Sequence, residues 1–425
     1  MADAGQKLTF IHLSDIHFVR DFSGHSAFDI DKFVRNELVL DARRVVLPLG
    51  QISGILVSGD IAFAGKAGDY ETALSWLSEL SDSVNCSPGL VWSVPGNHDV
   101  DRSVLKEHTT IQATQQQIRT HENLDSILKQ HLQSGDAALL FSPLRAYNET
   151  FASRLGCVTS PHQPWWEDDL ELNDGSILRL RGLNSAILSG PTDDRNTSKL
   201  CLGSVQTEYM REDRVTYLTL CHHPPDWLVD GDNVKKALRA YSKIQLLGHK
   251  HSHDIEETNG TLWLYSGAVH PVRDEKDWNP TYYILSISVE SSENSRRLKV
   301  DVCRRVWSQD QRAFVRPAGQ EADCVPYSLP LQAWTPSPAA EQTNAPSASR
   351  GTTMTVNRKK LLYAFVGLPY HVRMSIMRKL ELIDETNEKL PDSELFASCF
   401  DRAVRKGLLE QIWEAVETQT KSRTA

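Results

Sequence analysis

The chain has 425 residues, of which 40% are apolar and 24% charged, and its net charge is −9. This length predicts two or three domains, and the near-average composition excludes collagen-like, wholly disordered and disulfide-scaffold proteins. The first ten residues lack a secretory signal pattern, and no apolar run reaches the roughly 18 residues of a membrane-spanning helix, so no membrane association is expected.

Cysteine usage and charge indicate the compartment and the class of partner. The seven cysteines are scattered without a CxxC pair. A disulfide framework and a thiolate zinc site are therefore not expected, and a cytoplasmic location is predicted. Thirteen basic and ten acidic residues lie from Arg350 onward, which leaves a net charge of −12 before it. This acidic part gives no electrostatic basis for tight nonspecific binding of nucleic acid, which is the less favoured partner.

Short apolar runs alternate with helical patterns over the first 330 residues. The residues 28–47 and 70–80 have the three-and-four apolar spacing of helices, and the runs between such segments are typical of buried strands. This alternation predicts an α/β fold. The predicted strands are Leu8–Leu13, Ile52–Val57, Leu90–Val94, Val215–Cys221 and Ile244–Leu247. Three later runs, within residues 261–306, predict a second sheet or an antiparallel extension.

A polar segment with a helical pattern interrupts this alternation after residue 100. We expect a helical insertion over residues 101–170, and we expect Trp165 and Trp166 to pack it onto the main body. Stacking of these two rings on a substrate is the alternative.

The last part of the chain has a different composition. Residues 335–353 lack large apolar side chains and are rich in Pro, Ser, Thr and Ala, which is typical of a flexible linker. Helical apolar spacing resumes after them, for example at Phe396, Phe400 and Ala403. We therefore divide the chain into a body (1–330), a linker (331–354) and a small all-α bundle (355–425).

Five polar clusters each follow directly on a predicted strand. They are FIHLSDIH (Asp15, His17), GILVSGD (Asp60), LVWSVPGNHD (Asn97, His98, Asp99), YLTLCHHPP (His222, His223) and IQLLGHKH (His249, His251). Since sites in α/β sheets form beyond the carboxyl ends of strands, we expect five strands of one sheet to bring these side chains together. Imidazole, carboxylate and amide ligands without thiolate favour a catalytic pair of divalent metal ions over a structural zinc site.

These motifs, D-x-H, G-D, G-N-H-D, H-H-P-P and G-H-x-H in this order, resemble the calcineurin-like metallophosphoesterases over roughly residues 7–290. The resemblance implies a four-layer αββα sandwich and two divalent ions, for which Mn²⁺, Fe²⁺/Fe³⁺ and Zn²⁺ are suitable. Matched by position, it implies that one ion binds Asp15, His17 and His251, that the other binds Asn97, His222 and His249, and that Asp60 bridges them.

The resemblance also implies the chemistry. A hydroxide shared by the two ions would attack phosphorus. His98 would contact the phosphate or protonate the leaving oxygen, Asp99 or another carboxylate would orient it, and Asn97 would also lie at the substrate.

The expected reaction is hydrolysis of a small phosphoester. The residues of the LSDIH and HHPP motifs resemble those of the family branch that acts on phosphodiesters such as cyclic nucleotides. A nuclease or a protein phosphatase of the same superfamily is the alternative enzyme. An interaction protein with a silent metal site is the non-enzymatic alternative.

The C-terminal bundle resembles the death-like adaptor modules that are appended to bacterial conflict and signalling effectors. The residues that carry this resemblance are the Leu-Pro before an acidic helix start and the Arg-Lys-Gly-Leu-Leu that ends the helix. It implies a protein partner for residues 355–425, to which the linker would tether the enzyme. A bundle that packs on the body or dimerises is the alternative.

Overall fold

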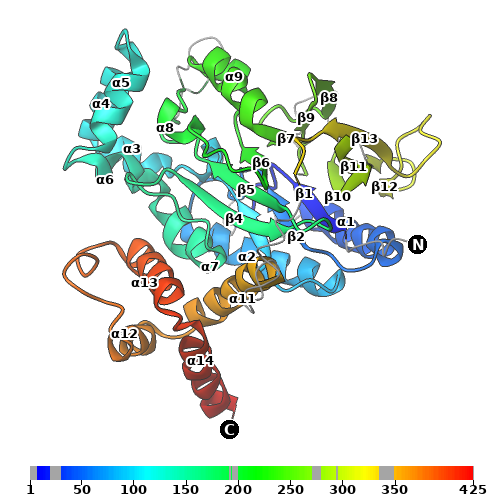
Figure 1. The fold of residues 1–425 in the computed structure, drawn as a ribbon. Coiled ribbons are helices and arrows are strands. Elements are labelled where there is room, and N and C mark those ends of the chain that lie inside the picture. Colours follow the sequence, from blue (N-terminus) through cyan, green and yellow to red (C-terminus); the bar gives the residue numbers. More distant parts are fainter. Residues whose placement is uncertain are drawn as a thin grey trace.

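The computed structural model describes residues 7–19, 30–190, 193, 200–269, 279–292, 295–334 and 349–424. Two mixed β-sheets pack face to face, and helices cover the outer face of each (Figure 1). The expected four-layer sandwich with a helical insertion and a C-terminal helical bundle is thus confirmed. None of the described helices combines the length and apolar character that crossing a bilayer requires.

The first sheet contains the N-terminal strands. Its order is β12 (Ala313–Val315), β11 (Ser295–Ser308), β10 (Thr281–Ser292), β1 (Leu8–Leu13), β2 (Gly54–Val57) and β3 (Val91–Ser93), and β13 (Val325–Pro330) also pairs with β11. The pairs β1–β2 and β2–β3 are parallel, whereas β10 is antiparallel to β1. Strand β1 is buried along its whole length, because one face meets the second sheet and the other is covered by helices.

The second sheet holds the other two strands that end in predicted site residues. Its order is β4 (Trp165–Glu171), β5 (Ile177–Leu183), β6 (Val215–Cys221), β7 (Ser242–Leu247), β9 (Thr261–Tyr265) and β8 (Asp254–Thr258). The inner pairs, from β5 to β9, are parallel. The expectation that one sheet delivers all five clusters is therefore wrong: β6 and β7 belong to the second sheet.

Alternate side chains of β6 explain why this strand reads as a continuous apolar run. Leu218 and Leu220 lie in the core between the sheets, and Tyr217 and Cys221 lie in the cluster beneath the outer helices. The layers outside the sheets are formed by α1 (Ile30–Val46), η1 (Leu47–Leu49), α2 (Ala67–Ser83), α8 (Ser204–Thr207) and α9 (Gly231–Tyr241).

The predicted helical insertion is present but ends earlier than residue 170. Its elements are α3 (Arg102–Glu107), α4 (Thr109–Thr120), α5 (Leu124–Leu132), α6 (Ala137–Phe141), η3 (Ser142–Leu144), η4 (Tyr147–Ala152) and α7 (Ser153–Leu155). Trp165 and Trp166 instead open β4, an edge strand of the second sheet. Nε1 of the buried Trp166 donates to the carbonyl of Ser93 at 2.8 Å, so this ring packs within the body, as expected.

The C-terminal bundle has its own apolar core. It consists of α11 (Ser349–Val366), α12 (Tyr370–Lys379), α13 (Asp392–Lys406) and α14 (Leu409–Thr424), packed around Phe365, Met377, Phe400 and Ile412. Helix α11 starts at Ser349, before the predicted boundary at 355. Most of the predicted linker, residues 335–348, lies outside the described residues.

The bundle packs on the body through α11 (Figure 1). Lys359, which is 2% exposed, donates to the carbonyl of Leu155. Its Nζ lies 3.6 Å from Oδ2 of Asp168 and 4.6 Å from the centroid of the Trp92 ring. The backbone of α11 approaches Gly89 so closely that a Cβ there would lie 2.9 Å from the Lys359 carbonyl oxygen. A lysine buried in this way fixes the bundle against the body. This arrangement agrees with the alternative expectation that the bundle packs on the body.

One disulfide joins Cys303 on β11 to Cys324, the residue before β13. The antiparallel register pairs Val302 with Val325 and so places the two cysteines opposite each other. The sequence pattern did not indicate this pair, because a single crosslink between paired strands has no characteristic spacing.

Candidate metal centre

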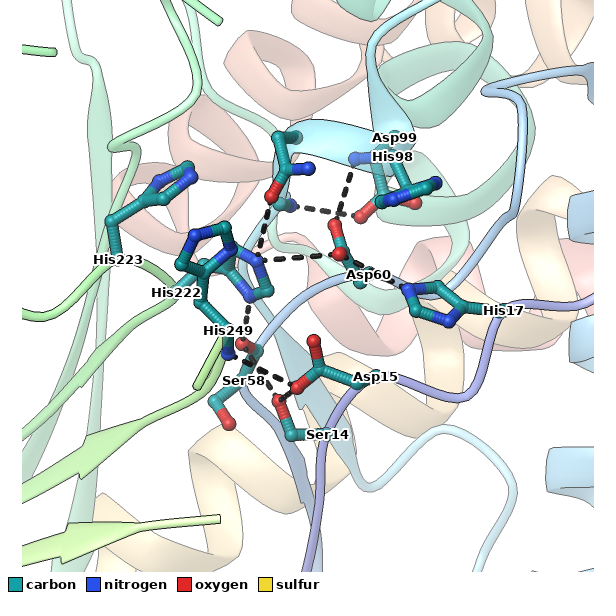
Figure 2. Close-up of polar contacts among 12 residues, drawn as sticks. Ser14, Asp15, His17, Ser58, Asp60, His98, Asp99, His222, His223 and His249 are labelled. Carbon is teal, nitrogen blue, oxygen red and sulfur yellow. Dashed lines mark hydrogen bonds and ion pairs between the residues drawn. The ribbon is translucent and has the colours of Figure 1, made fainter. Parts of the chain in front are cut away.

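The predicted site residues lie at the carboxyl ends of five strands from both sheets. Asp15 and His17 follow β1, Asp60 follows β2, Asn97 follows β3 in the short helix η2 (Asn97–Asp99), His222 follows β6, and His249 and His251 follow β7. They meet where the two sheets face each other, as Figure 2 shows for most of them. Sequence reasoning identified the strand ends correctly, and the sandwich rather than one sheet edge brings them together.

Many of the predicted ligands have a left-handed backbone conformation, which is uncommon for residues other than glycine. Nine described non-glycine residues have a positive φ, and five of them are predicted ligands: Asp15 (52°), His17 (54°), Asp60 (52°), His249 (71°) and His251 (53°). The left-handed region costs an L-residue about 1–2 kcal/mol. Such conformations cluster at functional sites, where the surrounding fold maintains them.

Asp60 lies at the middle of the cluster. Its Oδ2 is 3.1 Å from Nε2 of His17 and 3.4 Å from Nε2 of His222, and its Oδ1 accepts a hydrogen bond from the backbone N–H of His98 at 2.8 Å. Figure 2 shows His17 and His222 on either side of it. A Cβ at Gly96 would lie 2.1 Å from Oδ1 of Asp60, so the glycine of the G-N-H-D motif permits this close approach.

His222 is held in a defined orientation. Its Nδ1 donates to the carbonyl of Ser58 at 2.9 Å, and its Nε2 lies 3.1 Å from Oδ1 of Asn97. A hydrogen bond at one ring nitrogen that leaves the other facing the site is the arrangement of metal-binding histidines. A Cβ at Gly59 would lie 2.5 Å from Nδ1 of His222, which explains the glycine before Asp60.

Asp15 is held from two sides. Ser14 Oγ donates to its Oδ2 at 2.5 Å, and the backbone N–H of His249 donates to the same oxygen at 3.1 Å. Its Oδ1 lies 3.4 Å from Nε2 of His251. Asp15 thus links β1 of the first sheet with the loop after β7 of the second.

The donor atoms fit divalent metal ions. Asp15, His17 and His251 form one group whose ligand atoms lie within 4.8 Å of one another, and Asp60 joins such a group with Asp15 and His222. Nε2 of His249 is buried without a hydrogen-bond partner among the described residues. A buried polar atom of this kind is costly unless something binds it, and a cation satisfies both it and the two buried carboxylates.

Protonation in the metal-free protein follows from burial and charge. Burial lowers the pKa of His249 to about 3, so its imidazole is neutral, the form that binds metal. Burial also opposes protonation of His222, but the charges of Asp60 and Asp15 outweigh it and raise the pKa of His222 to about 9. A metal ion would replace that proton.

His223 is a buried residue of the cluster to which we assigned no role from the sequence. Its Nδ1 lies 2.9 Å from Ser185 Oγ, its ring centroid is 4.5 Å from that of His249, and its Nε2 is buried without a hydrogen-bond partner in the described part of the chain. Its position beside His222 was the only sequence feature that could have indicated that it lies in the cluster. Adjacency alone, however, does not identify which histidine of a pair faces the site.

His98 lies beside the cluster, with its ring centroid 4.6 Å from that of His17. Its Nδ1 is 2.9 Å from the carbonyl oxygen of Phe63. A carbonyl can only accept, so Nδ1 carries the proton and Nε2 is the atom available to a substrate. The carbonyl of Phe63, which sequence reasoning missed, therefore does the orienting that we expected of Asp99.

Asp99 is instead a buried structural carboxylate. Its Oδ2 accepts from the backbone N–H groups of Ile61 at 3.2 Å and Gly96 at 2.9 Å. Its Oδ1 accepts from the N–H of Ala62 at 2.9 Å and the hydroxyl of Tyr70 at 3.0 Å. With four donors bound, Asp99 fastens the loop after β2 to the loop after β3.

Comparisons with known proteins agree with this geometry. The model of the family "Calcineurin-like phosphoesterase" matches residues 8–253, and that of the "GTPase-associated adaptor domain" matches residues 357–418. The second match confirms the resemblance of the C-terminal bundle to adaptor modules.

Individual relatives are distant. The metallophosphoesterase-like protein YydB of Bacillus subtilis (strain 168) is 22% identical over 323 residues, which are 72% of this chain and 61% of that protein, so the chain spans about three fifths of its length. A predicted phosphoesterase from Streptococcus pneumoniae is a similar solved structure, with a TM-score of 0.29 and 13% identity over 76% of this chain and 98% of that one. GAP50, the anchor in the inner membrane complex of Plasmodium, is another similar solved structure. Its TM-score is 0.38, and it is 8% identical over 77% of this chain and 90% of that one. The family model covers more than half of the chain, and the chain therefore belongs to the calcineurin-like phosphoesterase family.

Proposed function

We propose that the chain is a dinuclear metal-dependent phosphodiesterase that acts on a nucleotide or another small phosphodiester. The observation that carries the proposal is the convergence of Asp60 with the imidazoles of His17 and His222, at 3.1 and 3.4 Å. A buried carboxylate between two imidazoles from different sheets is suited to bridge two cations.

The remaining donors divide into two sets around Asp60. Asp15, His17 and His251 would hold one ion, and Asn97, His222 and His249 the other. When bound, two Mn²⁺, Fe²⁺/Fe³⁺ or Zn²⁺ ions supply an activated water and neutralise the charge that develops on the phosphoryl oxygens. Every part of this set is present, which favours a catalytic site over a silent one.

His98 is the proposed general acid. Because Phe63 accepts its Nδ1–H, only Nε2 can exchange a proton with the oxygen that leaves phosphorus. Asn97, which is buried next to His222, orients the same phosphoryl group from the other side. His98→Ala is expected to retain bound metal and to lose most turnover.

We also propose that the adaptor module binds a protein partner. Its helices α12 and α14 carry Tyr370 and Trp413, which are 47% and 37% exposed, and exposed aromatic side chains are typical of protein interfaces. Since α11 packs on the body, the partner would bind beside a catalytic domain of fixed orientation rather than one on a free tether.

One experiment tests the proposed activity. The full chain is loaded with Mn²⁺ and given an aryl phosphomonoester, an aryl phosphodiester, cyclic nucleotides and single-stranded DNA, and metal content is measured in parallel. We expect the diesters to be hydrolysed fastest and Asp60→Asn, which keeps the size of the side chain, to lose both metal and turnover. A sample that takes up no transition metal and hydrolyses none of the substrates would refute the proposal. Preferential cleavage of DNA would replace it with the nuclease alternative.

A further inference from the structure

Phe63 presents an exposed ring at the rim of the candidate metal centre. It lies three residues after Asp60, and its side chain is 50% exposed. Its backbone is fixed on both sides, because its N–H donates to the carbonyl of Phe18 at 3.0 Å and its own carbonyl accepts from His98. The ring is therefore held in a defined place while half of it remains in contact with water.

The Phe63 ring continues a series of rings that begins at the candidate metal ligands. The centroids of His17 and His98 are 4.6 Å apart, and those of His98 and Phe63 are 5.3 Å apart with planes inclined by 38°. Phe63 also meets the edge of His17, at 6.2 Å and 85°. These separations lie in the range of interacting aromatic pairs, so a further ring placed on Phe63 would extend the same arrangement outward.

The surroundings of Phe63 favour one flat ring over an alkyl chain as its occupant. The next residues are Ala64 and Gly65, and Lys66 turns away to bind Asp101 through its Nζ at 2.6 Å. Among the described large apolar side chains that are exposed, Phe63 is the one whose ring contacts predicted site residues. A lipid tail would require a longer apolar surface, whereas one aromatic ring covers one base.

We propose that Phe63 is the platform on which the substrate's nucleobase stacks, which makes it a specificity-determining residue for nucleotide phosphoesters. The inference rests on the proposed phosphodiesterase function and narrows its substrate class. The base lies on the leaving-group side, because His98, which protonates the leaving oxygen, contacts Phe63 directly. A phosphoester without an aromatic ring would bind through its phosphate alone.

The test compares two ligands that share a sugar phosphate. Dissociation constants of adenosine 5′-monophosphate and ribose 5-phosphate are measured by calorimetry on the full chain loaded with Mn²⁺. We expect the nucleotide to bind about tenfold more tightly, which corresponds to about 1.4 kcal/mol of base stacking. Phe63→Leu, which keeps an apolar side chain but removes the ring, is expected to abolish this advantage and leave ribose 5-phosphate unaffected, and Phe63→Trp is expected to retain it.

The controls separate the inference from the proposed function. Phe33→Leu removes another exposed ring, one that packs against Trp307 at 5.9 Å, and it should leave both constants unchanged. The proposed function is supported if an aryl phosphodiester is hydrolysed and ribose 5-phosphate binds. The stacking platform is nevertheless refuted if the nucleotide then binds no more tightly than ribose 5-phosphate, or if Phe63→Leu still binds the nucleotide more tightly. If neither ligand binds and no diester is cleaved, both proposals fail.

Discussion

Five predicted ligands adopt backbone conformations that glycine would adopt at lower cost. His251 is the most suitable of them for a measurement, because its φ is 53° and its side chain is partly exposed. Alanine at this position suffers the same left-handed cost as histidine, whereas glycine does not.

In the metal-free protein we therefore expect His251→Gly to be more stable than His251→Ala by about 1 kcal/mol, measured by urea unfolding. His253 provides the control, because its φ is not positive. There the alanine variant should be at least as stable as the glycine variant. Equal stability of the two His251 variants would mean that the loop relaxes when the histidine is removed.

The titration of His222 gives a pH-dependent prediction. Its pKa is about 9 in the folded metal-free protein and 6.5 when unfolded, so its contribution to stability is complete below pH 6.5 and is lost as the pH rises through 9. We expect the free energy of unfolding of the metal-free protein to fall over this range and His222→Asn to remove that part of the slope. An identical slope in wild type and variant would contradict the assigned charge.

The residues that meet in the candidate metal centre could be predicted from sequence, but the groups that orient them could not. His222 and Asp60 stand in short motifs after apolar runs, so local pattern is sufficient. The carbonyls of Ser58 and Phe63 act through backbone atoms, which residue identity does not report. Ser58 is also 164 positions from His222, and only the packing of the two sheets brings them together.

At the level of elements, the loops after β2 and β3 act as one unit because Asp99 joins them. Asp99→Ala would leave three buried backbone N–H groups without their acceptor, and each such group costs about 1–3 kcal/mol. Tyr70→Phe removes only one of the four donors. We expect Asp99→Ala to destabilise the protein by at least 3 kcal/mol and to weaken metal binding, and Tyr70→Phe to cost about 1 kcal/mol and keep the metal. Thermal unfolding and metal analysis check both variants. Normal metal content in Asp99→Ala would count against the idea that Asp99 holds the two loops together for metal binding.

Strand positions were predictable to within a few residues, and the assignment of strands to sheets was not. β1 and β6 coincide with their predicted runs. Both are apolar on two faces, and such a run gives no information about which sheet contains it. β4 escaped prediction because its edge position leaves Glu167 and Asp169 partly exposed, so its sequence resembles the polar insertion before it.

For the whole molecule, Lys359 is the main polar contact between adaptor and body. Lys359→Met keeps much of the side-chain length but leaves the buried Asp168 without the lysine, and breaking a buried ion pair costs about 3–5 kcal/mol. We expect a loss of about 3 kcal/mol in unfolding free energy and faster amide exchange in α11 and β4. Lys379→Met, the same change at an exposed position of the bundle, is the control and should have neither effect. Unchanged exchange in Lys359→Met would show that apolar contacts alone hold the adaptor.

The position of α11 has a consequence for solubility. β3 and β4 are terminal strands of their sheets, and α11 contacts β4 and the segment leading into β3. An uncovered terminal strand offers unpaired backbone groups to other chains and promotes aggregation. Helix α11 lies across the flank where both sheets end. We therefore expect the metallophosphoesterase domain produced without the C-terminal bundle to aggregate at concentrations at which the full chain stays dispersed.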